Sequence, residues 1–534
     1  MVIGKMICQA MILVLVCYYA SSATPISGPL TDTLYNSGSP YEIVGDIYVP
    51  PFAHLIIEPA VVMNFQGNYS FHVNNGAVLG AIGTEADSIY FTCDTLLVPG
   101  GWGGIFFDTS GSGCIVQYCR IEFSKNGGIV GFRANPNIVN CHFTHNWPFH
   151  SDQFPRESSG ISFSNGSHPI IQYNLIDNNF WAHIFGILIY NSSAEIIGNT
   201  ITHLSGYQAI YLNNSYDVAL RNNVIANNNG EDGTAIRAVY GQNLVIEGNL
   251  ISNNNGWSSG EIALIDYMTN VIFRSNILSH NTALTGNIAP IFHFIDCDLV
   301  MAGNIIANNH ATRYPGVAIT GNVRLFANNV FVNNVSDRNI PVFLGNAPKI
   351  ENCIFWNNLP PQIDSILNYI YCDIQGGYPG HGNIDTDPLF RDTTSGDYHL
   401  MSIACGDAFE SPCIDAGSPL YYDDSLLCNW GLGTTLCDIG AYGGVSSYCI
   451  YDAGDVNGDG GANGIDVVYF VNYLKGGPDP IIYCNCANQP YFYPAADVNG
   501  NCEVNGLDVT YFVRFLKSQV PALHYCANCP PAGR

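Results

Sequence analysis

The stretch Asn223-Val-Ile-Ala-Asn-Asn228 recurs, with small changes, as Asn249-Leu-Ile-Ser-Asn-Asn254 and as Asn276-Ile-Leu-Ser-His-Asn281. The same frame occurs at Cys141, Asn174, Asn304, Asn329 and Cys353, and more loosely at Cys119, Asn199 and Cys372. The repeat period is therefore about 25 residues.

The repeats are short Val-, Ile-, Leu- and Phe-rich segments with no amphipathic helix between them. This pattern predicts an all-β solenoid in which each repeat is one coil of a parallel β-helix, stacked about 4.8 Å from the next coil. Leucine-rich repeats share the period, but they need Leu at several fixed positions, which this chain lacks.

The recurring Asn residues have a physical reason. Asn tolerates the left-handed backbone conformation of a corner, and its amide is both a donor and an acceptor. Stacked Asn side chains are therefore expected to form a hydrogen-bonded ladder along the solenoid. Cys in the same frame should fill the inward slot as a small apolar side chain at both ends of the ladder, at Cys119, Cys141, Cys353 and Cys372.

The repeat region resembles the right-handed parallel β-helix proteins, a group that includes polysaccharide lyases and glycosidases. Upstream, Leu55-Ile-Ile-Glu-Pro-Ala-Val and Gly101-Trp-Gly-Gly-Ile look like first coils. Downstream, Ser411-Pro-Cys-Ile-Asp-Ala-Gly417 and Asp438-Ile-Gly-Ala-Tyr442 look like a closing module. We expect a β-helix over 24–445, with a capping module at about 380–445. The fold alone does not define an activity, because it also serves adhesins and structural proteins.

The composition of the 534 residues excludes several classes of protein. Only 11% are charged, but 47% are hydrophobic and 12% aromatic, which argues against a disordered chain and against a coiled coil. The formal charge of −26 argues against nucleic-acid binding, which depends on Lys and Arg. Cations are the expected small partners.

Residues 1–23 have the pattern of a secretory signal peptide. Lys5 precedes a short apolar run, and Ser21-Ser22-Ala23 supplies small residues for cleavage. We therefore expect a secreted, extracellular protein with no later membrane span. Cleavage removes Cys8 and Cys17 and leaves 17 of the 19 cysteines, most of which should pair in an oxidising compartment.

Two acidic loops follow the repeat region: Asp455-Val-Asn-Gly-Asp-Gly-Gly-Ala-Asn-Gly-Ile-Asp466 and Asp497-Val-Asn-Gly-Asn-Cys-Glu-Val-Asn-Gly-Leu-Asp508. Oxygen side chains fall at loop positions 1, 3, 5, 9 and 12, as in an EF-hand loop that holds Ca²⁺. Each loop continues into an apolar segment with the pattern of an exit helix, and no entering helix is evident.

A duplicated half EF-hand of this kind closely resembles the type I dockerin, here expected over 450–534. The resemblance implies that Ca²⁺ is the cofactor and that a cohesin module on a scaffold or cell surface is the partner, facing Gly464-Ile465 and Gly506-Leu507. It also implies two sets of calcium ligands: Asp455, Asn457, Asp459, Gly461, Asn463 and Asp466 in the first loop, and Asp497, Asn499, Asn501, Glu503, Asn505 and Asp508 in the second. The second site should be weaker, because Cys502 replaces a Gly and Asn501 has no charge.

Candidate catalytic residues come from one strand series. With Ile inward, Ser162, Leu188, Tyr211, Arg237 and Ala263 should point outward from adjacent coils. Carboxylates and aromatic rings on neighbouring loops suit sugar binding and acid–base catalysis. The candidates are Asp152, Glu157, Tyr211, Asp232, Arg237 and Glu261. The alternative is a solvated strand face with ordinary surface charges.

Two functions stay open at this point. The first is a glycoside hydrolase or polysaccharide lyase that a scaffold brings to its polysaccharide. The second is a non-catalytic, adhesin-like surface protein anchored by the same module, which fits the absence of a familiar lyase motif. His145, His203 and His280 share one repeat column, but intervening Asn residues keep them more than one coil apart. They are therefore interpreted as corner residues and not as a metal site.

Overall fold

The computed structural model of this protein describes residues 23–529. The gaps lie at 96–100, 111–112, 148–157, 180–184, 258–259, 284–289, 313, 339–341, 346, 348, 361–362, 364–366, 420, 422, 424–425, 444–450, 459–460, 481–483, 487–488 and 527–528. Side chains are also left undescribed at 158–159, 314–315, 344, 485–486 and 489–491. The predicted signal peptide lies outside the described residues, apart from Ala23.

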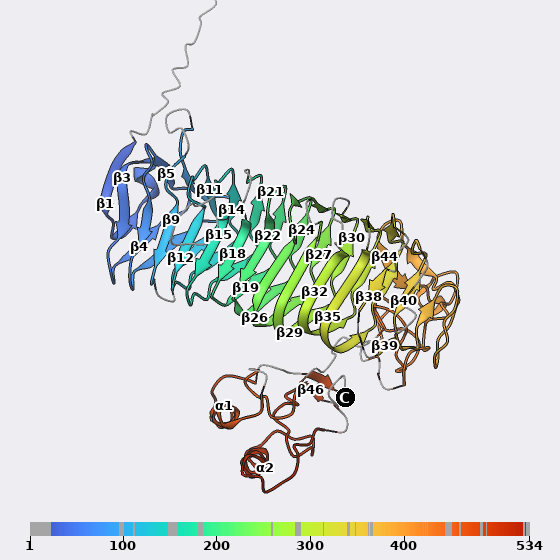
Figure 1. Cartoon of the computed structure of the whole chain (residues 1–534). Coiled ribbons are helices and arrows are strands. Elements are labelled where there is room, and N and C mark those ends of the chain that lie inside the picture. Colours follow the sequence, from blue (N-terminus) through green and yellow to red (C-terminus); the bar gives the residue numbers. More distant parts are fainter. Residues whose placement is uncertain are drawn as a thin grey trace, which may run out of the picture.

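The repeat region is a parallel β-solenoid (Figure 1). Strands at the same position in successive coils pair in parallel and build three faces, which we call A, B and C in chain order within a coil. The predicted β-helix is therefore confirmed.

Face A contains β6 (Phe71–Val73), β9 (Ile105–Asp108), β12 (Ile129–Phe132), β15 (Ser158–Ser164), β18 (Phe185–Tyr190), β22 (Gln208–Asn213), β26 (Ile236–Glu247), β29 (Ala263–Arg274), β32 (Pro290–Ala302), β35 (Tyr314–Ala327) and β38 (Phe343–Leu344). Four of these, β26, β29, β32 and β35, bend at the corner and continue into face B. Face B otherwise contains β2 (Asp32–Leu34), β4 (His54–Ile57), β7 (Val78–Ile82), β10 (Ile115–Gln117), β13 (Asn137–Val139), β16 (Ile170–Gln172), β19 (Ala194–Ile197), β23 (Tyr216–Arg221), β39 (Ile350–Glu351) and β41 (Tyr369–Ile370).

Face C contains β1 (Thr24–Pro29), β3 (Tyr41–Val49), β5 (Val62–Phe65), β8 (Ile89–Thr92), β11 (Cys119–Glu122), β14 (His142–Thr144), β17 (Leu175–Asp177), β20 (Thr200–Thr202), β24 (Val224–Ala226), β27 (Leu250–Ser252), β30 (Ile277–Ser279), β33 (Ile305–Ala307), β36 (Val330–Val332), β40 (Ile354–Trp356) and β42 (Asp373–Ile374). The first turn also contains a 3-10 helix, η1 (Asn36–Gly38), and β3 extends from face C into face A. A short fourth sheet follows face C: β21 (Ser205–Gly206), β25 (Asn229–Gly230), β28 (Asn255–Gly256), β31 (Thr282–Ala283), β34 (His310–Ala311) and β37 (Val335–Ser336).

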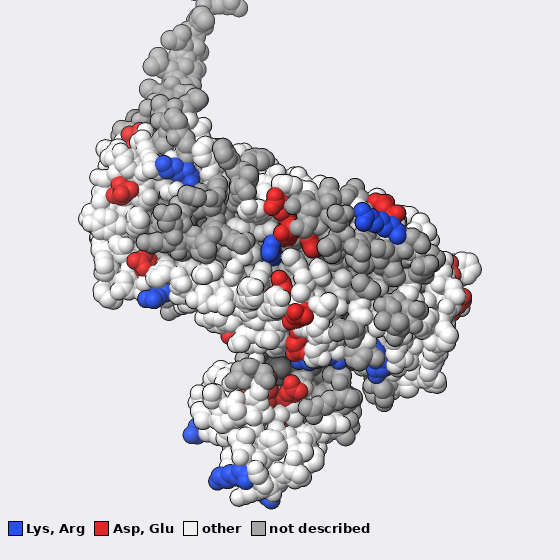
Figure 2. Space-filling model, viewed as in Figure 1, with Lys and Arg blue, Asp and Glu red and all other residues white. Residues whose placement is uncertain are grey.

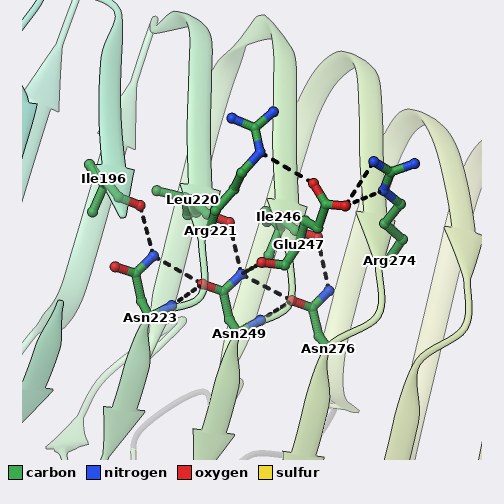
Figure 3. Close-up of polar contacts among 9 residues, drawn as sticks. All are labelled: Ile196, Leu220, Arg221, Asn223, Ile246, Glu247, Asn249, Arg274 and Asn276. Carbon is green, nitrogen blue, oxygen red and sulfur yellow. Dashed lines mark hydrogen bonds and ion pairs between the residues drawn. The ribbon is translucent and has the colours of Figure 1, made fainter. Parts of the chain in front are cut away.

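The predicted Asn ladder is present and buried (Figure 3). The Nδ2 of Asn249 donates to the Leu220 carbonyl oxygen at 2.8 Å and to the Oδ1 of Asn276 at 3.0 Å. Its own Oδ1 accepts the backbone N–H of Asn223 at 2.9 Å. Each rung therefore satisfies backbone groups of two neighbouring coils. A second column of the same kind runs through Asn228, Asn254, Asn281, Asn309 and Asn334.

The left-handed conformation belongs to the residue before each rung and not to the rung itself. Asn222, before Asn223, has φ 54°, and Asn253, before Asn254, has φ 54°. The three predicted corner histidines, His145, His203 and His280, hold equivalent positions with φ 55°, 53° and 57°. The ladder Asn is selected for its amide, while the preceding residue makes the turn.

The cysteine slots at the ends of the ladder are confirmed, but the expectation that most cysteines pair is wrong. Cys141 donates its N–H to the Oδ1 of Asn174, and the N–H of Asn329 donates to the Sγ of Cys353 at 3.3 Å. Nine described cysteines are free, and all are buried: Cys93, Cys114, Cys119, Cys141, Cys297, Cys353, Cys372, Cys413 and Cys437. Seven of these thiols pack in the apolar core of the coils, and the other two, Cys413 and Cys437, lie in the capping module.

The predicted capping module packs on the side of the last coils. Outward side chains of β33, β36 and β40 (Ile305, Val330 and Ile354) share an apolar cluster with Tyr398 and Ile439. The module contains the antiparallel pair β43 (Phe390–Asp392) and β44 (Asp397–Leu400), the 3-10 helix η2 (Ile403–Cys405) and the disulfide Cys405–Cys428. The column itself ends at Asn383, whose Oδ1 accepts the N–H of Cys372 at 2.9 Å. The domain limits 24–445 and 450–534 stay predictions.

The C-terminal module contains two helices, α1 (Gly464–Leu474) and α2 (Gly506–Leu516), and a short antiparallel pair, β45 (Cys484–Cys486) and β46 (Gln489–Phe492). Phe470 and Phe512, one from each helix, are fully buried in its small core. Neither helix is preceded by an entering helix in the described residues. No helix in the described part of the chain has the length and apolar character needed to cross a membrane.

Candidate functional site

Outward-pointing residues of face A form a column across the coils. The strand register pairs Ser162 with Leu188, and Leu188 with Tyr211. It then pairs Tyr211 with Arg237. The sequence predicts these four neighbours correctly, because the inward Ile of each strand fixes which residue faces out.

The next member of the column is Leu264 and not Ala263, so that prediction is wrong. Arg237 pairs with Leu264, whereas Ala263 pairs with the inward Ile236 and is buried in the core. The segment between Trp257 and Ala263 contains one residue more than its counterpart in the preceding coil, which shifts the register by one. The column then continues to His293.

The part of this column upstream of Arg237 is buried. Leu188 is 3% exposed and Tyr211 is 2% exposed, although both point away from the core. Together with Phe185 and Val239 they form an apolar cluster outside face A. The hydroxyl of Tyr211 accepts a hydrogen bond from Asn213 at 2.6 Å. This region is therefore not an ordinary solvated strand face.

Five ionisable side chains lie next to the apolar cluster, and we call them the central cluster: Asp232, Arg237, Glu261, Asp266 and His293. The Nη1 of Arg237 lies 3.3 Å from the Oδ2 of Asp232. The Nδ1 of His293 lies 3.5 Å from the Oε1 of Glu261. Figure 2 shows acidic side chains gathered in a band across the middle coils, with a basic side chain among them.

Several polar atoms of the central cluster are buried and have no hydrogen-bond partner among the residues that the structure describes. They are Asp232 Oδ1, Arg237 Nε, Glu261 Oε2 and Asp266 Oδ1, together with Gln208 Oε1 from β22. Glu261 is only 8% exposed and Gln208 only 3%. Buried polar atoms in folded proteins are normally satisfied, so this cluster is ready to accept a polar ligand or water.

Burial raises the pKa of Asp266, while Arg237 and His293 act in the opposite direction and Asp296 adds to the increase. Asp266 therefore holds its proton more tightly than an ordinary aspartic acid does. The central cluster thus offers carboxyl groups in different environments, which is what general acid–base chemistry uses.

The structure brings Asp232, Arg237 and Glu261 together and places Tyr211 in the next strand. Two other predicted candidates, Asp152 and Glu157, lie outside the described residues. The residues that the sequence did not identify as candidates are Asp266, His293 and Gln208. The corrected register would have found the first two, because Asp266 is two residues beyond Leu264 and His293 pairs with Leu264.

The second candidate region is the pair of acidic loops before α1 and α2. In the first loop, Asp466 is fully buried and accepts the N–H groups of Val456, at 2.9 Å, and Asn457, at 3.1 Å. Asp455 is 5% exposed, and the Gly461 carbonyl oxygen accepts the Nδ2 of Asn463 at 2.9 Å. Asp459 lies outside the described residues.

The second loop is folded around Asp497, which is fully buried and accepts N–H groups from Gly500, Asn501 and Cys502. Asp508 accepts the N–H of Asn499 at 3.2 Å. Local hydrogen bonds connect the remaining residues of this loop. The backbone N–H of Asn501 donates to the Asn499 side chain, and the backbone N–H of Glu503 donates to the Asn501 side chain. The Nδ2 of Asn505 donates to the Glu503 carboxylate.

Two residues in each loop also start the following helix. Asn463 and Asp466 form a capping box at α1, and Asn505 and Asp508 form one at α2. The helix start therefore depends on the same carboxylates that close the loop.

Burial raises the pKa of Asp508 to about 6, and the nearby Asp497 adds to the increase. The pKa of Asp497 is raised too, mainly by burial. Two buried carboxyl groups that face each other are costly to ionise without a cation. The oxygen-only donor set and this electrostatic strain fit a hard divalent cation such as Ca²⁺.

Cys502 occupies the position of the expected Gly, with φ 64°, and forms a disulfide with Cys526. The sulfur atoms lie near Asp497, and these three residues are the only group of three or more His, Cys, Asp or Glu in the described residues whose ligand atoms could share an ion. Because the sulfurs are bonded to each other, they are not thiolate ligands. Cys484 and Cys529 of the same module are also disulfide-bonded.

Three segments of the chain match known families. Residues 96–185 match the family described as right handed beta helix region, and residues 182–341 match the family described as periplasmic copper-binding protein (NosD). Residues 453–517 match the dockerin type I domain. No curated protein matches the chain.

Several solved structures are similar to this chain at low identity. Pectate lyase Pel9A is 12% identical, with a TM-score of 0.29, and the match covers 79% of this chain and 98% of that one. The periplasmic alginate epimerase AlgG is 11% identical, with a TM-score of 0.21, over 67% of this chain and 69% of the epimerase. A tailspike protein of E. coli bacteriophage HK620, in complex with a pentasaccharide, is 12% identical, with a TM-score of 0.26, over 64% and 71%. These scores carry no argument about activity.

The stacked coils and the two loop–helix units agree with the family matches over their respective segments. The chain is a right-handed parallel β-helix repeat protein with a C-terminal type I dockerin-like domain.

Proposed function

We propose that the protein is secreted, binds a polysaccharide at the central cluster and cleaves its glycosidic bonds. The observation that carries this proposal is the set of buried, unpartnered oxygen and nitrogen atoms on Asp232, Arg237, Glu261 and Asp266. A sugar chain offers hydroxyl groups to both donors and acceptors of this set.

The roles follow from the environment of each carboxyl group. Asp266, whose pKa burial raises, is the proton donor to the leaving oxygen. Glu261, whose Oε2 is unpartnered, acts as the base or nucleophile on the other side of the bond. Arg237 and Gln208 hold sugar hydroxyls, and His293 positions the Glu261 carboxylate.

The test is a panel of polysaccharides incubated with the full chain, followed by assays for new reducing ends and for the ultraviolet absorbance of an unsaturated lyase product. Glu261→Gln and Asp266→Asn should each lower the rate by about 100-fold or more. Glu195→Gln is the matched control, since Glu195 lies on face B. Binding without cleavage would support the non-catalytic surface protein instead, and the absence of both would overturn the proposal.

We further propose that the C-terminal module binds two Ca²⁺ ions and attaches the protein to a cohesin module. The ligands would be Asp455, Asn457, Asp459, Gly461, Asn463 and Asp466, and Asp497, Asn499, Asn501, Glu503, Asn505 and Asp508. Ile465 at the start of α1 is 64% exposed and Leu507 at the start of α2 is 66% exposed, which supports a role in contacting a partner. Loss of cohesin binding on chelation, restored by Ca²⁺, is the expected result. Binding that is unaffected by chelation would refute the attachment.

A further inference from the structure

Two exposed tyrosines stand at one corner of the coils. Tyr240 is 56% exposed and Tyr267 is 48% exposed, and their rings stack at 5.4 Å with an angle of 7° between the planes. Both residues adopt the left-handed conformation, with φ 55° and 51°. The neighbouring coils have Asn214 and Asp296 at this corner, which suit that conformation better than a bulky ring does. Because these rings are exposed, they add little to the packing of the core. Their position at the surface therefore favours a role in contacting a ligand.

The tyrosine pair borders the central cluster. Tyr267 directly follows Asp266 in β29, and Tyr240 directly follows Val239 of the outer apolar cluster in β26. Trp257, which is 41% exposed, lies at the opposite corner of the same coils. Its backbone N–H donates there to the Gly230 carbonyl oxygen at 2.9 Å. The part of β29 between these corners, 263–267, spans about 16 Å. Aromatic rings therefore lie on both sides of the unpartnered polar atoms.

The charge of this surface selects among polysaccharides. With Asp266 protonated, the carboxylates Asp232 and Glu261 outnumber Arg237, the permanent cation of the central cluster, and the chain as a whole has a formal charge of −26. Arg237 is already paired with Asp232. An anionic polymer would meet net repulsion here, whereas an uncharged sugar can stack on the rings and bond to the carboxylates.

We propose that Tyr240 and Tyr267 form a stacking subsite for a neutral polysaccharide, which crosses face A from Trp257 to the tyrosine pair, along the strands and not along the solenoid axis. This inference rests on the proposed function, because the central cluster is where the bound sugar chain meets the acid and the base.

The test measures the affinity of the full chain for soluble neutral polymers (a β-glucan, a xylan and a mannan) and for anionic ones (polygalacturonate and alginate). One or more neutral polymers should bind more tightly than either anionic polymer. Tyr240→Ala, Tyr267→Ala and Trp257→Ala should each weaken that binding by about fivefold or more. Tyr173→Ala is the matched control, because Tyr173 is 59% exposed at another left-handed corner, and it should bind as the unchanged protein does.

Each contrary result identifies which part fails. Unchanged affinity in both tyrosine variants, with the polymer still bound or cleaved, would overturn the subsite and leave the proposed function standing. Unchanged affinity in Trp257→Ala alone would overturn the direction of the polymer. Tighter binding of an anionic polymer would overturn the substrate class. If no polymer is bound or cleaved, the proposed function itself fails.

Discussion

At the scale of single residues, a ladder Asn supports groups in two coils at once. Replacing Asn249 by Leu would leave the Asn223 N–H and the Leu220 carbonyl oxygen without these partners in a buried position. We expect a loss of about 1–3 kcal/mol in the free energy of unfolding. Chemical denaturation of the variant and of the unchanged protein measures it.

The control for this variant needs an Asn whose side chain has no such role. Asn270 is unsuitable, because it accepts a hydrogen bond from Arg324 at 2.7 Å and donates one to Asn243 at 2.9 Å. Asn137 on face B is half-buried and presents its side chain outward. Asn137→Leu should cost much less than Asn249→Leu, and equal costs would contradict the ladder.

Two buried carboxyl groups predict a pH dependence: Asp373 of β42, which contacts the capping module at Cys413, and Asp438 of the module itself. Burial raises the pKa of Asp373 and of Asp438 to about 7 each, with Asp385 and Asp387 near the first and Asp415 and Glu410 near the second adding to the increase. Because the folded state holds these protons more tightly, their contribution to stability is complete below the unfolded pKa of about 4 and is lost as the pH rises through 7. The module should therefore be more stable at pH 5 than at pH 8.

Hydrogen exchange of residues 384–443 at the two pH values measures this difference. Asp373→Asn and Asp438→Asn remove the titrating proton, so each should reduce the dependence on pH. An increase in protection from pH 5 to pH 8 would contradict the assignment.

At the scale of elements, the calcium loops and their helices act as units, because Asp466 and Asp508 both close a loop and cap a helix. Asp466→Asn and Asp508→Asn keep an acceptor for the cap but remove a negative charge, so each should weaken Ca²⁺ binding by about tenfold or more. Asn501→Ala, which removes a neutral ligand, should have a smaller effect. Calorimetric titration of the full chain after chelation tests this.

The exposed Asp479, which lies beyond the loops, supplies the control. Asp479→Asn should bind Ca²⁺ as the unchanged protein does. Equal weakening in Asp479→Asn and Asp466→Asn would mean that overall charge, and not loop geometry, governs the binding.

How far the sequence predicts these elements depends on what sets each one. The period of the Asn frame predicts the coils, because every rung has the same backbone groups to satisfy. The outward column was predicted as far as Arg237, where each strand has an inward Ile that marks the register, and it failed at Ala263, because Ala263 and not Ile262 pairs with the inward Ile236. The gathering of Asp266 and His293 with Glu261 depends on that register, so pattern alone did not reveal it. The loop ligands follow from spacing within one segment, but the Cys502–Cys526 disulfide joins segments whose contact the sequence does not specify.

At the scale of the whole molecule, the cysteines of the coils differ in oxidation state from those of the C-terminal module. Disulfides lie in the capping module and in the C-terminal module, at Cys405–Cys428 and Cys502–Cys526, while every described cysteine of the coils is a buried free thiol. Burial raises the pKa of Cys93 and of Cys297 to about 11. Thiol-labelling of the native protein should therefore be slow, and it should become fast only when the coils unfold. Rapid labelling of the native coils would contradict this packing.

Those same thiols bear on how long the protein survives. Once the coils separate in an oxidising medium, thiols that were held apart by the stack can react with each other and with the existing disulfides. The chain then cross-links in non-native pairs before the coils can rewind, so unfolding becomes irreversible. For a protein with this interior, durability outside a reducing environment is set by the height of the barrier to the first separation of coils more than by the equilibrium between folded and unfolded states.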